Sequence, residues 1–189
     1  MPRSAIVVAV SMIKDKVCAV TGAGSGIGRA LAIELGRRGA RAVAISDVNE
    51  TGLGATAAAV QATGAGIHRS RLDVSDRDAM LAWAAELAQQ FHVVHQICNN
   101  AGIADAGTIE EFGFDAYRRV LDINLWGVIH GTKAFLPYLI ASGTAMWSTS
   151  RASTASWLRP SSAPTARRSS PSAASPRPWR SSWHRLGAR

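Results

Sequence analysis

Short apolar runs alternate with longer segments of helical periodicity along residues 16–143. Runs such as KVCAVTG at 16–22 are typical of buried strands, and segments such as DAMLAWAAELAQQF at 78–91 are typical of amphipathic helices, with Ser75 or Asp76 as the expected N-cap. The predicted strands are 16–22, 41–47, 67–74 and a fourth that runs into a polar turn within 93–102, and the predicted helices are 26–40, 50–64, 78–91 and 114–143. This alternation predicts βαβ units and an α/β fold around a parallel sheet.

The pattern ends at Gly143. Residues 144–189 show neither helical nor alternating periodicity, and five prolines interrupt any helix there. The apolar content of this segment is mostly Ala and Trp, so it can bury little surface, and we predict that it is disordered. The predicted sheet is therefore incomplete on its C-terminal side. We divide the chain into an N-terminal extension (1–11), a nucleotide-binding domain (12–143) and a tail (144–189).

The net charge of +8 lies entirely in this tail, which holds eight arginines and no acidic residue, whereas residues 1–143 carry 13 basic and 13 acidic residues.

The composition argues against a disulfide-rich, membrane-spanning, secreted or metal-binding protein. Cys18 and Cys98 lie in separate apolar runs and are expected to be reduced core residues. No apolar run approaches the about 20 residues of a membrane span, and MPRSAIVVAV is too short for a signal segment, so we expect a cytoplasmic protein without membrane contact. The five histidines show no metal-ligand spacing, so no metal site is expected.

A glycine-rich loop, TGAGSGIG (Thr21–Gly28), lies between the first predicted strand and helix. Gly22 and Gly24 permit a tight turn, Gly26 lets the backbone approach a pyrophosphate, and Gly28 lets the helix pack close to the sheet. The free N–H groups at the helix N-terminus favour phosphate groups. Asp47 ends the second strand about 20 residues further on, as a dinucleotide site requires. A flexible surface loop would explain neither the strand nor this acid.

Asp47 can accept both ribose hydroxyl hydrogens of an adenosine and repels a 2′-phosphate, so NAD is favoured over NADP. Arg29 is the one cation near the loop that argues for a 2′-phosphate, although an arginine there is more often a solvated helix residue. Asp73 and Val74 end the third predicted strand, where the carboxylate would meet an adenine amino group or cap the next helix.

Four motifs, TGAGSGIG, LDV (72–74), NNAG (99–102) and LDINLWGV (121–128), resemble the short-chain dehydrogenase/reductase family in order and spacing over about residues 12–143. The resemblance implies a doubly wound Rossmann-like fold, a homo-oligomer, and NAD(P)-dependent hydride transfer between nicotinamide and an alcohol or carbonyl substrate. It also implies that Asn124 belongs to the catalytic Asn-Ser-Tyr-Lys tetrad, where it holds a water in a proton relay. The alternative role of Asn124 is a helix kink or a hydrogen bond to a neighbouring strand. The candidate cofactor-binding residues are Thr21, Gly22, Ser25, Gly26, Ile27, Gly28, Asp47, Asp73, Val74, Asn100, Ala101 and Gly102.

The other tetrad members are missing from the sequence as written. The family uses a Tyr-x-x-x-Lys pair, but Tyr117 and Tyr138 are followed at that spacing by Leu121 and Ser142. Lys133 lies outside any such pair and is expected at the surface. We therefore expect this chain to be catalytically defective.

The tail is compatible with the family's catalytic segment read in the wrong frame. In the shifted frame Met146/Trp147 must encode Val, Arg151/Ala152 can encode Ser, Pro164/Thr165 can encode Tyr, and Arg168/Ser169 can encode Lys four codons later. Two alternatives remain. In the first, the tail is a real basic arm whose Arg and Trp residues bind nucleic acid or an anionic surface. In the second, the chain is a pseudoenzyme that binds cofactor and acts through protein contacts. We expect no nucleic-acid partner.

Overall fold

Five parallel strands form one sheet in the computed structural model, which describes residues 13–105, 108, 110–143 and 146–149. The strands are β1 (Val17–Thr21), β2 (Ala42–Asp47), β3 (Gly66–Arg71), β4 (Gln96–Asn99) and β5 (Met146–Thr149). Their order is β3-β2-β1-β4-β5, so the chain moves outward from β1 to β3 and then returns to the other side of β1. The predicted doubly wound α/β fold is confirmed, and its switch point lies between β1 and β4.

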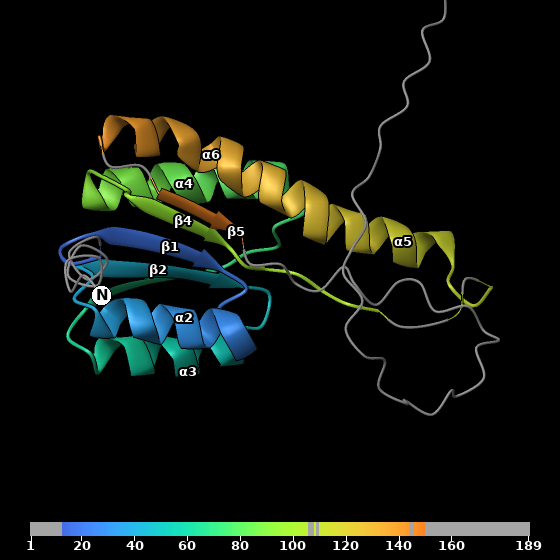
Figure 1. The fold of residues 1–189 in the computed structure, drawn as a ribbon, viewed down its shortest axis with the longest axis horizontal. Helices are drawn as coiled ribbons and strands as arrows, with labels where there is room; N and C mark the ends of the chain where they lie inside the picture. The colour runs from blue at the N-terminus through green and yellow to red at the C-terminus, as the bar shows by residue number, and fades with distance from the viewer. Residues whose placement is uncertain (1–12, 106–107, 109, 144–145, 150–189) are drawn as a thin grey trace, which may run out of the picture. The chain divides into compact units, whose positions relative to one another are not determined.

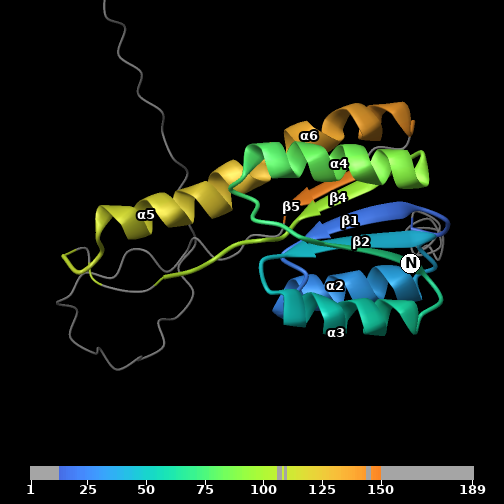
Figure 2. The ribbon, with the colours of Figure 1, turned by 180° about the vertical axis from the view of Figure 1, so that it is seen from behind.

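Helices cover both faces of the sheet, with α2 and α3 on one face and α4 and α6 on the other (Figures 1 and 2). The helical segments are α2 (Gly26–Arg37), α3 (Glu50–Gln61), α4 (Arg77–Phe91), α5 (Phe114–Leu121), the π-helical turn η1 (Asp122–Trp126) and α6 (Gly127–Ala141). Asp76 is the N-cap of α4, since its carboxylate accepts hydrogen bonds from the backbone N–H groups of Asp78 and Ala79 at 3.0 Å each. One of the two predicted capping residues is thus confirmed.

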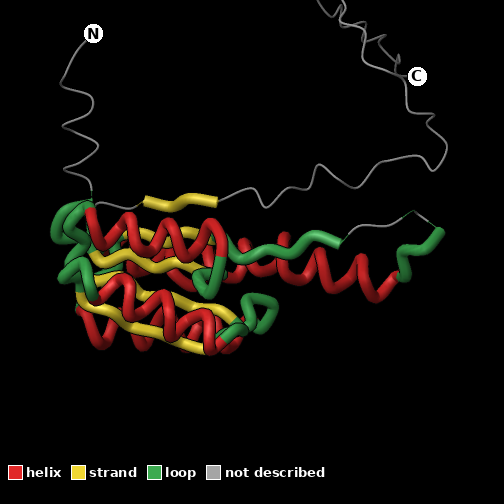
Figure 3. Tube along the Cα trace, turned by 90° about the horizontal axis from the view of Figure 1, so that it is seen from below, coloured by secondary structure: helices red, strands yellow, loops and turns green. Residues whose placement is uncertain are grey.

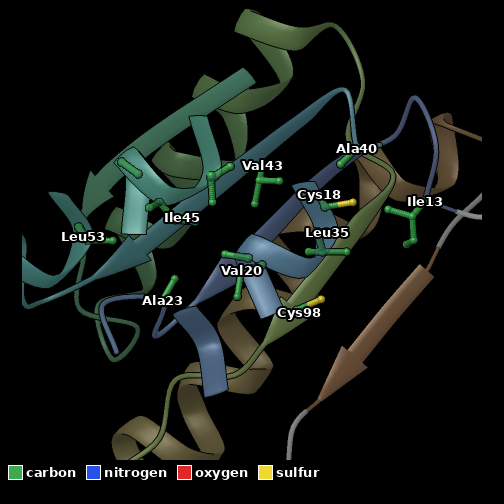
Figure 4. Packing of buried hydrophobic residues seen from close by; sticks show 13 residues of the cluster. Ile13, Cys18, Val20, Ala23, Leu35, Ala40, Val43, Ile45, Leu53 and Cys98 are labelled. Atoms are coloured by element: carbon green, nitrogen blue, oxygen red, sulfur yellow. The ribbon is translucent and has the colours of Figure 1, made fainter. Parts of the chain in front are cut away.

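The two covered faces produce two apolar clusters. All five residues of β1 are buried, because neighbouring side chains point to opposite faces and both faces carry helices. Cys18 and Val20 pack with Leu35 of α2 on one side (Figure 4). Ala19 packs on the other side with residues of α4 and α6 that include Phe135. The sheet therefore forms the centre of a three-layer core.

Both cysteines belong to the first cluster and are free thiols, as expected. Burial is the main cause that raises the pKa of Cys18 to about 12 and that of Cys98 to about 11. A thiol reacts as the thiolate, so these two groups are chemically inert core residues at neutral pH.

Two predicted strands are too long. The third was predicted to end at Val74, but β3 ends at Arg71 and the chain then leaves the sheet. The fourth was predicted to begin at Val93 and to run into a polar turn before residue 102, but β4 begins only at Gln96 and ends at Asn99. After β3, Leu72 and Val74 are buried in the cluster with α4 and α6, and after β4 the chain lines the site described below. Periodicity alone does not distinguish these environments from a strand.

The structure also corrects the prediction for the start of the tail. Residues 146–149 form β5, which pairs in parallel with β4 in the register Gln96↔Met146 to Asn99↔Thr149. The prediction of no regular structure from residue 144 onward is wrong for these four residues. The unpaired edge of β4 offers backbone groups to any strand that follows α6, whatever its side chains.

The predicted helix at 114–143 contains a π-helical turn at its centre. The segments α5, η1 and α6 follow one another without a break, and η1 separates two α-helical parts. Figure 3 shows that the α5 part projects beyond the sheet. π-helical turns inside α-helices are frequent at functional sites, and η1 carries Asn124.

The N-terminal extension and residues 150–189 lie outside the described residues. Within the described part of the chain, no helix has the length and apolar character that crossing a membrane requires.

A histidine at the start of the sheet accepts a backbone hydrogen bond that only its neutral form can accept. Val17 N–H donates to Nδ1 of His95 at 3.0 Å, and the His95 N–H donates to the Val17 carbonyl at 2.9 Å. The pKa of His95 is lowered from 6.5, first by burial and then by the positive charges of Lys16 and Arg41. A protonated ring cannot accept the bond from Val17.

We expect the free energy of unfolding to receive its full His95 contribution above pH 6.5 and to lose it as the pH falls from there through the lowered pKa. The unfolded state binds more protons in that window, so stability rises with pH. Urea unfolding of the wild type and His95→Gln from pH 5 to 8 tests this. Parallel stability profiles of the two proteins would contradict it.

Candidate dinucleotide-binding site

The loop between β1 and α2 lies at the carboxyl end of the sheet, beside the switch point. Gly22 has a φ of +67°, which favours glycine. A Cβ atom on Gly22 would lie 2.6 Å from the Cα atom of Ala101, so the chain after β4 passes directly against this loop. Segments that are distant in sequence thus form one crevice.

The N-terminus of α2 opens into this crevice. Ser25 is its N-cap but makes no side-chain capping hydrogen bond, and no acidic residue occupies the first turn. A Cβ atom on Gly26 would have open space for 4 Å around it, whereas one on Gly28 would collide with the Gly22 carbonyl oxygen. The helix terminus is therefore uncapped, accessible and packed close to the loop, as an anion site requires.

Asp47 ends β2 and faces the loop. Its Oδ2 accepts a hydrogen bond from Gly24 N–H at 2.8 Å, and its Oδ1 accepts one from Asn49 N–H at 2.9 Å. Each carboxylate oxygen has a second lone-pair site. The carboxylate is thus fixed in place and still able to accept hydrogen bonds from hydroxyl groups in the crevice.

Arg29 turns back toward the protein instead of into the crevice. Its guanidinium donates to the Gly24 carbonyl oxygen at 2.5 Å and to Thr56 Oγ1 at 3.1 Å. It is therefore neither the solvated residue nor the phosphate-facing cation considered from the sequence.

The segment after β3 forms the wall opposite α2. Asp73 Oδ1 accepts hydrogen bonds from the N–H and the hydroxyl of Ser75, at 2.9 and 2.7 Å. The Val74 carbonyl lies 3.1 Å from Nδ1 of His130, and a Cβ on Gly127 would lie 2.6 Å from Val74 Cγ2. Asp73 thus organises the turn before α4 but does not cap that helix, whose N-cap is Asp76.

Thr21 and Asn100 join the ends of β1 and β4. Thr21 Oγ1 accepts hydrogen bonds from the N–H groups of Asn100 and Ala101, both at 3.0 Å. Asn100 Nδ2 donates to the carbonyl oxygens of Thr21 and Gly22 at 3.0 and 3.1 Å. Thr21 is 2% exposed, so it supports the crevice from behind.

These segments enclose a cavity of about 430 Å³. Its lining includes every candidate cofactor residue from the sequence except the buried Thr21. The lining residues that the sequence analysis missed are Val48, Leu72, Ile103, Arg119 and Ile123. Val48, Leu72 and Ile103 are sequence neighbours of candidate residues, so their position in the chain could have indicated them. Arg119 and Ile123 reach the cavity only because α5 and η1 pass over it, which no local signal shows.

Asn124 binds the chain that leaves the cavity. Its Oδ1 accepts a hydrogen bond from Ile103 N–H at 2.9 Å, and its Nδ2 donates to the Ile103 carbonyl oxygen at 2.8 Å. The sequence analysis considered a helix kink or a hydrogen bond to a neighbouring strand for this residue. The structure shows a hydrogen bond to the segment that follows β4, and the Asn124 backbone lies in the π-helical turn.

We expect Asn124→Ala to lower the free energy of unfolding by about 1 to 3 kcal/mol, because both polar groups of Ile103 lose their partner. Urea unfolding followed by circular dichroism measures the change. Leu125→Ala, in the same turn and 50% exposed, is the control and should change stability by less than about 0.5 kcal/mol. Equal effects of the two substitutions would show that the pair with Ile103 contributes nothing specific.

The two tyrosines and Lys133 lie outside the cavity lining. Tyr117 packs its ring on Phe112, with centroids 4.7 Å apart. Tyr138 packs against the core between the sheet, α4 and α6, and Lys133 is exposed, as expected. Among the described residues, no three His, Cys, Asp or Glu side chains gather as metal ligands would.

The fold and the cavity define a nucleotide-binding α/β protein, and comparison with known proteins identifies its family. Residues 16–159 match the family model described as short chain dehydrogenase. The chain belongs to this family. The match extends beyond Gly143, where the resemblance found in the sequence ended.

One curated relative is "Putative oxidoreductase SadH" of Mycobacterium tuberculosis, which is 49% identical over 133 residues, 70% of this chain and 48% of the relative. The chain spans about half the length of the first curated relatives that it matches, or less. NAD+-bound xylitol dehydrogenase is a similar solved structure, with a TM-score of 0.69 and 30% identity over 72% of this chain and 53% of that one. An alcohol dehydrogenase from Thermococcus sibiricus in complex with 5-hydroxy-NADP has a TM-score of 0.67 and 30% identity over 71% and 57%.

Proposed function

We propose that the cavity binds NAD and that the reaction of the intact protein is hydride transfer between the nicotinamide and an alcohol or carbonyl group. The observation that carries this proposal is the pairing of an uncapped helix N-terminus with a fixed carboxylate. The N–H groups of α2 would hold the diphosphate, and Asp47 would accept hydrogen bonds from the adenosine ribose. The named relatives with NAD or 5-hydroxy-NADP support a nicotinamide dinucleotide as the ligand class. The bound nicotinamide would supply the hydride acceptor or donor.

Asp47 favours NAD because its negative charge would face a 2′-phosphate, and the guanidinium of Arg29 is engaged by the loop and Thr56. Titration calorimetry of the full chain with NAD and NADP tests this preference. Asp47→Asn keeps the shape of the side chain and removes its charge. We expect it to reduce the difference between the affinities for NAD and NADP. Asp78→Asn removes an exposed charge on α4 and should leave the preference unchanged. Equal binding of both dinucleotides by the wild type would refute the proposed specificity.

We infer further that the 189-residue chain does not turn over substrate. Asn124 is the only tetrad position that its sequence fills, and its side chain is already paired with the Ile103 backbone. Neither tyrosine nor Lys133 lines the cavity. Incubation of the mass-verified chain with NAD and a panel of alcohols should produce no NADH. Any turnover above a blank without protein would overturn this inference.

The tail is proposed to be the out-of-frame reading of the family's catalytic segment, and not a nucleic-acid-binding arm. Support comes from the forced Val codon at Met146/Trp147. Sequencing of the gene across codons 135–190 tests it. A single-base discrepancy would support the proposal, and confirmation of the present frame would refute it.

A further inference from the structure

A buried hydroxyl in α3 holds the glycine-rich loop from behind. Thr56 is fully buried. Its Oγ1 lies 2.8 Å from the Ala23 carbonyl oxygen and 3.0 Å from the Gly52 carbonyl oxygen, and it accepts a hydrogen bond from Arg29 Nε at 3.1 Å. One hydroxyl thus connects the loop, the helix α3 and the first turn of α2.

Two consecutive peptide groups of the loop are fixed by these contacts. In a trans peptide the C=O and the following N–H point in opposite directions. The Ala23–Gly24 peptide is held at both ends, since its oxygen faces Thr56 and its N–H donates to Asp47. The next peptide is held at its oxygen by Arg29, so the N–H of Ser25 is directed to the opposite side. Ser25 lines the cavity.

The loop also approaches the start of α3 closely at Gly24. A Cβ atom on Gly52 would collide with the Gly24 carbonyl oxygen. Asn49 Oδ1 accepts a hydrogen bond from Gly52 N–H at 3.0 Å, and Asn49 N–H donates to Asp47. The ribose-facing carboxylate and the loop are therefore held by one connected set of hydrogen bonds from the start of α3.

We propose that Thr56 and Arg29 are positioning residues for the dinucleotide diphosphate. They hold the carbonyl oxygens of Ala23 and Gly24 away from the cavity, so that N–H groups and not oxygens face the phosphates. This inference rests on the proposed NAD site. It predicts a larger effect on the phosphate-binding part of the ligand than on the ribose, because Asp47 keeps its hydrogen bond from Asn49 N–H when the loop shifts.

Thr56→Val tests the proposal, because it removes the hydroxyl and keeps the shape. Its effect on two ligands is compared by titration of the full chain: NAD carries a diphosphate, and adenosine carries none. We expect NAD binding to weaken by about 10- to 100-fold, the range found for outer-shell partners of metal ligands. Adenosine binding, followed by ligand-observed NMR, should weaken much less than NAD binding.

The matched control is Thr63→Val, just beyond the C-terminal end of α3, whose hydroxyl donates to the Val60 carbonyl oxygen at 2.6 Å. It should leave both ligands unaffected. Arg29→Met is a second test, at a residue that is only partly buried. It should reproduce the selective loss of NAD binding even if Thr56→Val does not fold. Thr56→Ser, which keeps the hydroxyl, should bind NAD as the wild type does.

Each outcome decides between the two proposals. If folded Thr56→Val and Arg29→Met bind NAD as the wild type does, or lose NAD and adenosine equally, the positioning role is overturned while the NAD site stands. If the wild type itself binds no NAD, the proposed function fails, and the positioning role fails with it.

Discussion

Replacement of Phe135 by alanine is expected to lower the free energy of unfolding by about 3 to 5 kcal/mol. Phe135 of α6 is fully buried in the cluster that joins α4 and α6 to the sheet. Its ring meets Trp83 of α4 edge to face, with centroids 5.3 Å apart and planes at 76°. The substitution removes the favourable burial of the ring and its contact with Trp83. It also leaves a cavity, because the neighbouring strands cannot move in to fill the space.

Leu136 offers the matched control, because it is the next residue of the same helix and is 47% exposed. Leu136→Ala should change stability by less than about 0.5 kcal/mol. Urea unfolding followed by far-ultraviolet circular dichroism measures both variants. A loss below about 1 kcal/mol for Phe135→Ala would mean that α6 is not packed on α4 as the structure shows.

Gly28→Ala is expected to weaken NAD binding by about 5- to 150-fold. The added Cβ would collide with the Gly22 carbonyl oxygen and approach Nδ2 of Asn100. Overpacking costs about 1 to 3 kcal/mol. If this cost destabilises the loop conformation that binds NAD, the affinity falls by about 5- to 150-fold. Because Asn100 Nδ2 also donates to the carbonyl oxygens of Thr21 and Gly22, the displacement would disturb the ends of both β1 and β4.

Gly54→Ala is the control for Gly28→Ala. Gly54 lies in the helix α3, and the nearest atom that an added Cβ would meet is Arg69 Nη1 at 3.6 Å, an ordinary contact. This variant should bind NAD as the wild type does and gain about 0.5 to 1 kcal/mol of stability, because alanine favours a helix interior. Calorimetric titration with NAD and thermal unfolding separate the two effects. Equal NAD affinities of folded Gly28→Ala and wild type would show that the close approach of α2 to the loop is not needed for binding.

Much of the dinucleotide site could be predicted from the sequence, because local rules determine it. The strand-to-helix position of TGAGSGIG and the acid that ends the next strand, Asp47, can both be read from the order of local patterns along the chain. A parallel order of strands then brings their carboxyl ends to one edge, so residues after β1, β2 and β4 had to meet there. Every candidate cofactor residue except Thr21 accordingly lines one cavity.

The tertiary structure decided what depends on contacts between distant segments. Strand β5 exists because β4 has an edge to pair with, not because residues 146–149 show a strand pattern. The resemblance implied a relay role for Asn124, and the structure adds that its side chain pairs with the Ile103 backbone. Arg29 and Thr56 received their roles only when α3 packed against the loop. The sequence by itself determined the succession of strands and helices along the chain and the chemistry of the glycine-rich loop. Only packing determined where strands end and which polar groups meet, because each depends on what lies across the sheet.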